Sequence, residues 1–289
     1  MYDIQLVEET VLRLIRTAVT TLPADVVGEL ERSLDIEDTE VAKVQLRTIL
    51  ENIELAERKR LPMCQDTGVP IFFVSGPNLA SIEEGIALGV SKATKEVPLR
   101  PNVVDPITRH NRGNNLGEEM PSIHFERAKG DFLEITYLPK GAGSENMSVL
   151  RMLNPSQGVD GIRDAVLDAV VKAEGKPCPP TIVGIGIGGA SDQALLLAKK
   201  ALLRPLDVPN KDKHLAAMEN ELKETLNRTG VGPMGLGGRT TVLGVRIEKA
   251  SCHTASLPIG INLQCWAARR CSARIYPDGI VKFSTEGFW

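Results

Sequence analysis

The chain has 289 residues, of which 25% are charged and 42% are hydrophobic, and its formal net charge is −3 at pH 7. This length is sufficient for one large domain or two smaller ones, and the slight negative charge argues against a nucleic-acid-binding protein, which is usually basic. No apolar segment approaches the roughly 20 residues of a membrane span. The N-terminus lacks a basic segment followed by an apolar one, so we expect no signal peptide and a cytoplasmic location.

Apolar residues recur at helical spacing along three N-terminal segments, residues 4–21, 23–34 and 39–58. Pro23 suits the first turn of the second segment, and Asp38 or Thr39 can cap the third. The pattern predicts a helical N-terminal region, residues 1–58, that serves as a scaffold.

A loop that carries four chemically active side chains follows this region. Residues 61–68 read Leu-Pro-Met-Cys-Gln-Asp-Thr-Gly and precede an apolar segment, 70–74, that predicts a strand. Cys64, Gln65, Asp66 and the hydroxyl of Thr67 therefore stand side by side on a loop, the kind of segment that carries binding and catalytic residues. Asp66 can also simply cap the turn.

A helix is predicted over residues 82–94, and a long segment with little periodicity, 97–120, comes after it. A loop of this length inside a compact domain is typically functional or disordered. Arg100, Arg109 and Arg112 lie in it and indicate contact with an anion. The alternative is a solvated surface loop.

The middle of the chain alternates strand-like segments with glycine-rich loops. Residues 122–127 and 132–138 predict a β-hairpin, which leads into Lys140-Gly141-Ala142-Gly143-Ser144-Glu145-Asn146. Glycines there allow a ligand to approach the backbone closely, and the helix start that follows presents free N–H groups. A helix is predicted from about 158 to 174.

A second cysteine loop, residues 175–180, precedes a predicted strand, 181–187. Gly184, Gly186 and Gly189 match G-x-G-x-x-G by letter. We disfavour a dinucleotide site because these glycines begin inside the strand and no second strand ending in an acidic residue follows. The strand, turn and helix start could still hold a carboxylate.

Helices are predicted over 193–203 and 211–227, and a glycine-dense loop, 230–238, leads to a strand over 240–248. Residues 274–283 predict a closing hairpin with a Pro-Asp-Gly turn. Helices and strands mix without a regular βαβ rhythm. We therefore expect an irregular α/β (mixed α+β) fold, with residues 1–289 as a single domain and a mixed sheet bearing glycine-rich loops.

The five cysteines form neither a disulfide framework nor a C-x-x-C pair. Cys64, Cys178 and Cys265 lie next to polar or Gly/Pro-rich sequence, whereas Cys252 and Cys271 adjoin apolar segments and could be packing thiols. Three thiolates suit a soft metal or an iron–sulfur cluster and leave a coordination position open. Inert thiols, or a nucleophilic Cys252 or Cys265 activated by His253, are the alternatives.

Several motifs, in their order along nearly the whole chain, resemble the alpha subunit of class I iron–sulfur fumarate hydratase, which is equivalent to the N-terminal half of single-chain enzymes. The alpha subunit of L-tartrate dehydratase has the same pattern. The matching segments are residues 62–68, 140–146, 178–186 and 232–238, and the segment from His253 to Cys265.

The resemblance implies a [4Fe–4S] cluster bound by Cys64, Cys178 and Cys265, with one iron left without a protein ligand for the substrate. It also implies that Gln65 and Asp66 contact the substrate and that Asp66 is the candidate acid. Arg100 would bind a carboxylate, with Arg109 and Arg112 as competitors for that role. Gly143 would offer a backbone contact, and His253 would lie near the other end of the substrate, or be a structural hydrogen-bonding residue.

In this family the C-terminal half supplies further substrate contacts and the proposed catalytic base. The resemblance therefore implies a separate beta subunit in a probable α2β2 assembly and reversible hydration of fumarate to (S)-malate. Dehydration of L-tartrate to oxaloacetate is the alternative within the family. An iron–sulfur redox sensor, or a nucleotide-binding protein that uses the turn after Gly184, are the alternatives from other classes.

Overall fold

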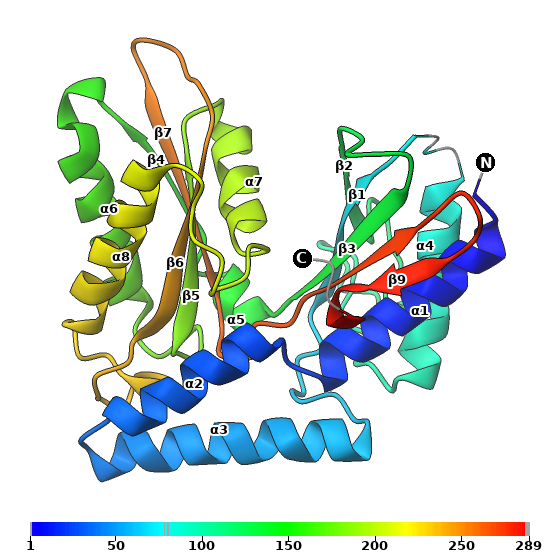
Figure 1. Ribbon diagram of the computed structural model, residues 1–289, viewed down its shortest axis with the longest axis horizontal. Coiled ribbons are helices and arrows are strands. Elements are labelled where there is room, and N and C mark those ends of the chain that lie inside the picture. Colours follow the sequence, from blue (N-terminus) through cyan, green and yellow to red (C-terminus); the bar gives the residue numbers. More distant parts are fainter. Residues whose placement is uncertain (1, 78, 80, 287–289) are drawn as a thin grey trace. The chain divides into compact units, whose positions relative to one another are not determined.

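A computed structural model describes residues 2–77, 79 and 81–286 of the chain (Figure 1). It divides into two compact units, each with its own sheet and core. The first unit comprises residues 1–23, 52–141 and 269–289, and the second comprises residues 24–51 and 142–268. The expected mixture of helices with mixed sheets is confirmed, although there are two sheets instead of one. The single-domain assignment stays a prediction.

The first unit contains a five-stranded sheet in the order β2-β1-β3-β8-β9. Its elements are α1 (Ile4–Thr20), β1 (Val69–Ser75), α4 (Ile82–Glu96), β2 (Ser122–Glu126), β3 (Leu133–Lys140), β8 (Cys271–Ile275), β9 (Val281–Phe283) and the short 3₁₀ helix η3 (Ser284–Glu286). The closing hairpin is confirmed, because β8 and β9 pair antiparallel.

The predicted hairpin of residues 122–138 is wrong. β1 lies between its two strands: it pairs in parallel with β2, from Ile71–Ser122 to Ser75–Glu126, and antiparallel with β3. The two strand-like segments were correctly located, but the short connection between them wrongly indicated that they pair with each other. Pairing with β1 buries all eight residues of β3 at the centre of the sheet.

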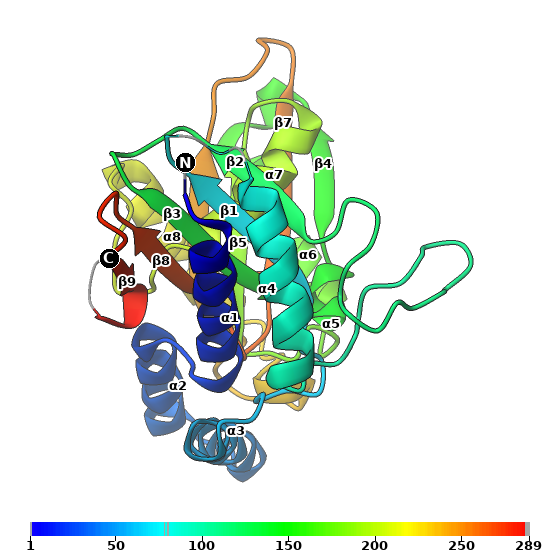
Figure 2. The ribbon, with the colours of Figure 1, turned by 90° about the vertical axis from the view of Figure 1, so that its right-hand side faces the viewer.

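Helices α1 and α4 lie side by side and pack against β1, β3 and β8 of the first unit (Figure 2). Two glycines of α4 allow this close approach. A Cβ atom on Gly85 would come within 2.7 Å of Val7, and one on Gly89 within 2.7 Å of Val11. The apolar stripe of α1 thus packs directly against the backbone of α4.

The second unit contains a four-stranded sheet in the order β4-β7-β5-β6. Its elements are α2 (Ala24–Ile36), the first part of α3 (Glu40–Lys59), α5 (Ala142–Glu145), β4 (Val149–Leu153), η1 (Pro155–Gln157), α6 (Gly158–Ala173), β5 (Thr181–Ile187), α7 (Ser191–Ala201), α8 (Lys213–Asn227), η2 (Pro233–Gly235), β6 (Val242–Lys249) and β7 (Leu257–Gln264). The predicted helical region 1–58 is confirmed as α1, α2 and α3.

Helices cover both faces of this second sheet, with α6 and α8 on one face and α7 on the other (Figure 1). Gly184 and Gly186 face α7, where a Cβ atom would lie 2.1 Å from the Ala198 carbonyl oxygen and 2.0 Å from that of Ala194. These two glycines therefore serve close strand–helix packing, which explains their presence in the G-x-G-x-x-G pattern without a nucleotide. Among the helices of the described ranges, none is both long and apolar enough to span a bilayer.

Candidate functional site

The Cys64 loop lies in the first unit, between α3 and β1. The Met63 N–H donates to the Val19 carbonyl across 3.0 Å, and the Asn52 side-chain amide donates to the Met63 carbonyl across 2.8 Å. The chain is thus fixed immediately before Cys64. Cys64 and Asp66 are half-buried and Gln65 is exposed, so the loop presents these side chains from a rigid base.

The Asp66 carboxylate has two hydrogen-bond donors on one oxygen and the Gly141 backbone close to the other. Its Oδ1 accepts from the Gly68 N–H at 2.9 Å and from the Asn102 amide at 3.2 Å. Its Oδ2 lies 3.2 Å from where a Cβ atom on Gly141 would stand. Asp66 therefore does cap its own turn, as the structural alternative proposed, and the same contacts fix the orientation of its carboxylate.

Arg100 is tied to this loop through Thr67. The Thr67 hydroxyl accepts from the Arg100 N–H at 3.1 Å and donates to the Arg100 carbonyl at 3.2 Å. The Arg100 side chain is exposed, and its backbone is bonded to the residue that follows Asp66. Arg109 and Arg112 also are exposed but lie further along the loop, where the Arg109 N–H donates to Asp105. Arg100 is thus tied by its backbone to the loop that carries Asp66, and its role as the carboxylate-binding residue stays a prediction.

Sequence reasoning missed two residues around Asp66, namely Asn102 and Arg269. Arg269 is 1% exposed, and its Nε and Nη1 have no hydrogen-bond partner among the described residues. Its Nη2 is 3.9 Å from the Cβ position of Gly141 that also adjoins Asp66. Burial raises the pKa of the neighbouring Tyr137 phenol, and the positive charge of Arg269 offsets part of that rise. An adjacent Arg-Arg pair four residues after Cys265 was the available signal.

Cys178 and Cys265 meet through the backbone of the second unit. The Trp266 N–H donates to the Cys178 carbonyl across 3.2 Å, and the Cys178 N–H donates to the Gly175 carbonyl across 3.0 Å. Cys178 has a left-handed φ of 54°, which is uncommon outside glycine, and both thiols are half-buried. Two of the three cysteines predicted as ligands are thus held on adjoining loops.

Two glycine-rich motifs pack against the Cys178 loop. The Met234 N–H donates to the Pro179 carbonyl at 2.7 Å, and a Cβ atom on Gly235 would come within 2.5 Å of Gly175. A Cβ atom on Gly143 would likewise come within 3.0 Å of the Lys176 carbonyl. Glycine in these two motifs therefore lets both of them approach the Cys178 loop closely.

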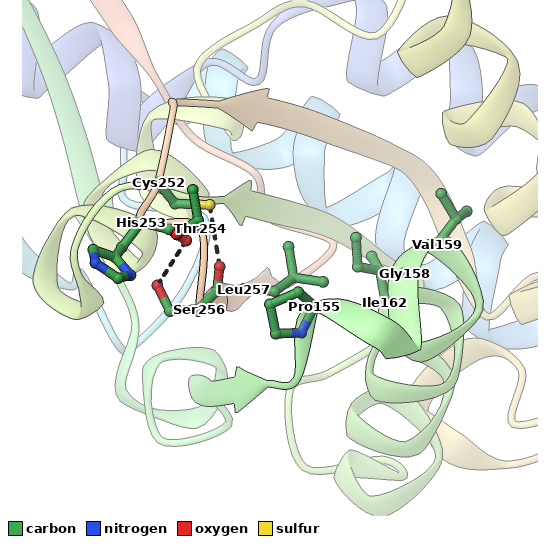
Figure 3. A pocket seen from close by; sticks show the side chains of 9 residues that line it. All are labelled: Pro155, Gly158, Val159, Ile162, Cys252, His253, Thr254, Ser256 and Leu257. Atoms are coloured by element: carbon green, nitrogen blue, oxygen red, sulfur yellow. Dashed lines mark hydrogen bonds between the residues drawn. The ribbon is translucent and has the colours of Figure 1, made fainter.

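His253 and Cys252 line a hollow of about 360 Å³ in the second unit, together with residues at the start of α6 (Figure 3). The His253 Nδ1 accepts from the Ala255 N–H at 3.1 Å, so the neutral imidazole carries its proton on Nε2. The Cys252 thiol donates to the Ser256 carbonyl at 3.3 Å. Because these bonds turn the two side chains to separate partners, a Cys252–His253 nucleophile has no support.

The remaining cysteines differ from each other. Cys271 is 1% exposed, as expected for a packing thiol, and burial raises the pKa of its thiol to about 11. The expectation that Cys252 packs in a core is wrong, because it is exposed on the loop before β7. Within the described ranges, no group of three or more His, Cys, Asp or Glu side chains is gathered to hold a metal ion. Cys64 belongs to the first unit, whereas Cys178 and Cys265 belong to the second.

Comparison with known proteins matches residues 8–274 to the family described as fumarate hydratase. A protein of Methanocaldococcus jannaschii named putative L(+)-tartrate dehydratase subunit alpha is 51% identical, over 94% of this chain and 98% of its own length. A protein of Geobacillus stearothermophilus named putative fumarate hydratase class I is 36% identical, over 93% of this chain but 55% of its own length. The L(+)-tartrate dehydratase subunit alpha of Escherichia coli strain UTI89 is 34% identical, over 90% of this chain and 87% of its own length. The chain therefore belongs to the fumarate hydratase family of hydro-lyases.

Proposed function

We propose that this chain is the alpha subunit of a [4Fe–4S] hydro-lyase that reversibly hydrates fumarate to (S)-malate together with a separate beta subunit. The observation that carries the proposal is the hydrogen bond from Trp266 to Cys178, which brings the backbones of two predicted ligand cysteines together. It occurs in a member of the fumarate hydratase family.

The chemistry of the three cysteines predicted as ligands supports an iron–sulfur cluster. Cys64, Cys178 and Cys265 are half-buried thiols on loops and form no disulfide, and soft thiolate donors are the usual ligands of such clusters. Cys271 and Cys252 do not offer the same setting, since one is in a core and the other is exposed. When bound, the cluster would supply Lewis acidity at an iron that has no protein ligand.

The chain's own residues would bind and orient the dicarboxylate. Arg100 would bind a carboxylate through charged hydrogen bonds, and the exposed Gln65 would contact the substrate beside it. Gly143, exposed on α5, would offer a backbone N–H. His253 would donate a hydrogen bond to the substrate from Nε2. This nitrogen carries the proton of the neutral ring because Nδ1 accepts from the Ala255 N–H.

Asp66 would be the acid that delivers a proton to the departing hydroxyl in the dehydration direction. The contacts at Oδ1 from Gly68 and Asn102 hold its carboxylate in one orientation. A positioned carboxyl group of this kind contributes by general acid catalysis.

A beta subunit would complete the site. Two relatives are named alpha subunits, and the chain spans 55% of the Geobacillus stearothermophilus relative. The missing part would supply the base and further cations for the dicarboxylate. We expect an α2β2 assembly in the cytoplasm.

Dehydration of L-tartrate to oxaloacetate is the second candidate. The Methanocaldococcus jannaschii relative, which is named for tartrate, is 51% identical and matches over 98% of its length. Tartrate differs from malate by one hydroxyl, so a single hydrogen-bonding group can distinguish them.

The test is anaerobic co-purification with the beta subunit, followed by fumarate and tartrate assays in parallel. We expect a brown complex with about four irons per alpha chain and a higher kcat/KM for fumarate. A higher kcat/KM for tartrate would favour the second candidate. A colourless complex that takes up no iron and hydrates neither compound would reject both.

A further inference from the structure

The orientation of the Asp66 carboxylate depends on a residue from a separate loop. Asn102 reaches back across 36 positions and donates from its side-chain amide to Asp66 Oδ1 at 3.2 Å. The same nitrogen lies 3.1 Å from the Gly68 carbonyl and 3.4 Å from the Thr67 hydroxyl. One amide group thus links Asp66 to both residues that follow it.

Asn102 is itself held in place by a buried asparagine. Its N–H donates to Asn115 Oδ1 at 2.7 Å, and Asn115 is 3% exposed. The Asn115 amide in turn donates to the Thr94 hydroxyl at 3.0 Å and to the Arg100 carbonyl at 3.2 Å. The Asn102 donor is therefore anchored to the end of α4 and does not depend on the exposed part of the loop.

Hydrogen-bond donors contribute to the orientation of this carboxylate because its own terminal torsion is weakly restricted. The terminal torsion of an aspartate is broad, so hydrogen bonds decide which way each oxygen faces. The Gly68 N–H reaches Oδ1 from within the same turn. The Asn102 amide approaches the same oxygen from another segment, and two donors on one oxygen fix the plane of the carboxylate.

We propose that Asn102 is a positioning residue for the hydro-lyase reaction and acts through Asp66. The inference rests on the proposed function, in which Asp66 is the acid. A misplaced acid lowers the rate of the chemical step more than it lowers binding, and small displacements of a reacting group can cost about 100-fold in rate.

The test uses the assembled complex, with kcat and KM normalised to cluster content, and two variants of Asn102. Asn102→Ala removes the donor. Asn102→Asp keeps the side-chain shape but replaces the donor with an acceptor. We expect each variant to lower kcat by about 10-fold to 100-fold, with a smaller change in KM. The matched control is Asn111→Ala, which removes a hydrogen bond from the side-chain amide to the Pro101 carbonyl in the same loop and should change kcat by less than about twofold.

A double-mutant cycle with Asp66→Asn shows whether Asn102 acts through Asp66. In the Asp66→Asn background, the added Asn102→Ala change should alter neither residual kcat nor the dissociation constant of the unreactive dicarboxylate succinate by more than about twofold. Succinate binding gives a readout that does not require turnover.

Two results would overturn the proposal: wild-type kcat in both Asn102 variants, or an equal loss from Asn102→Ala with and without Asp66. If Asn102→Ala loses iron or does not fold, the kcat of Asn102→Asp and its succinate binding test the proposal instead. If the wild-type complex hydrates neither fumarate nor tartrate, the proposed function fails instead, which is a distinguishable outcome.

Discussion

The Cys178 carbonyl accepts a hydrogen bond from the Trp266 N–H across 3.2 Å, which places the residue after Cys265 against Cys178. This contact joins two loops separated in the sequence by three strands, two α-helices and the 3₁₀ helix η2. Because it is made by the backbone, it survives any side-chain change at either cysteine. Substitution of the thiols should therefore affect ligand chemistry while the loops stay together.

Changing Cys64, Cys178 or Cys265 to serine should abolish the iron content of anaerobically reconstituted protein, from about four irons per chain to near zero. A serine hydroxyl is a poor substitute for a soft thiolate ligand. Cys252→Ser is the matched control, since that exposed thiol should be dispensable. Iron and visible absorbance are the measurements. Full iron retention in any of the three variants would remove that residue from the ligand set.

Cys252 and Cys271 should differ in their rate of alkylation. Burial raises the pKa of the Cys271 thiol to about 11, so only about one molecule in a thousand is a thiolate at pH 8. Exposed Cys252 should react with iodoacetamide in the native protein, whereas Cys271 should react only after unfolding in urea. Peptide mass spectrometry gives the result. Because the pKa of Cys271 is raised by folding, its contribution to stability is complete below about pH 8.5 and declines as pH rises towards 11.

The sequence predicted the local elements better than their pairing. Helices such as α1 were located to within one or two residues because their apolar faces have a clear period. The hairpin of β2 and β3 was wrong because β1, which precedes both, inserts between them. Pairing across a sheet depends on burial, which a local pattern does not encode.

The same limit applies to the candidate site. Asp66 and the three cysteines predicted as ligands stood in recognisable motifs, whereas Asn102 had no motif of its own. Its role arises from a 36-residue contact. The burial of Arg269 to 1% exposure likewise depends on the packing of β3 and the segment before β8, which no local window contains.

Gly186→Ala should destabilise the second unit strongly. Its Cβ atom would stand 2.0 Å from the Ala194 carbonyl oxygen of α7, and overpacking of this kind costs about 1–3 kcal/mol or more. Gly28→Ala is the control with the opposite sign: it meets only ordinary contacts at 3.7 Å in α2 and should stabilise the protein by up to about 1 kcal/mol. Thermal unfolding distinguishes them. A stable Gly186→Ala protein would contradict the packing role.

Glu134 should make stability depend on pH in the acidic range. Burial raises its pKa, but hydrogen bonds from Lys129 and Arg274 outweigh burial, so the pKa lies below the usual value. The ionised form therefore stabilises the fold above about pH 4.3, and this contribution is lost as pH falls through the folded pKa. Glu134→Gln should lower the unfolding free energy by about 1–3 kcal/mol at pH 7 and by less at pH 3.

The control for Glu134 is Glu96→Gln, which removes an exposed ion pair with Arg16 and should cost less than about 1 kcal/mol. Urea unfolding at pH 3, 5 and 7 measures both variants. An unchanged difference between wild type and Glu134→Gln across this range would show that the carboxylate charge is not the source of the effect.

Arg269→Met should raise the melting temperature while it lowers activity. The guanidinium is 1% exposed, with Nε and Nη1 unpartnered among the described residues, and a poorly paired buried charge is costly compared with an apolar side chain of similar size. Its Nη2 and Asp66 Oδ2 both lie within 4 Å of the position that a Cβ atom on Gly141 would take, so we expect loss of this charge near the proposed acid to lower activity. Arg269→Lys should retain more activity than Arg269→Met because it keeps the charge. Differential scanning fluorimetry measures the melting temperature, and fumarate hydration measures activity. A lower melting temperature in Arg269→Met would show that Arg269 stabilises the fold. Unchanged activity would show that Arg269 does not influence the reaction.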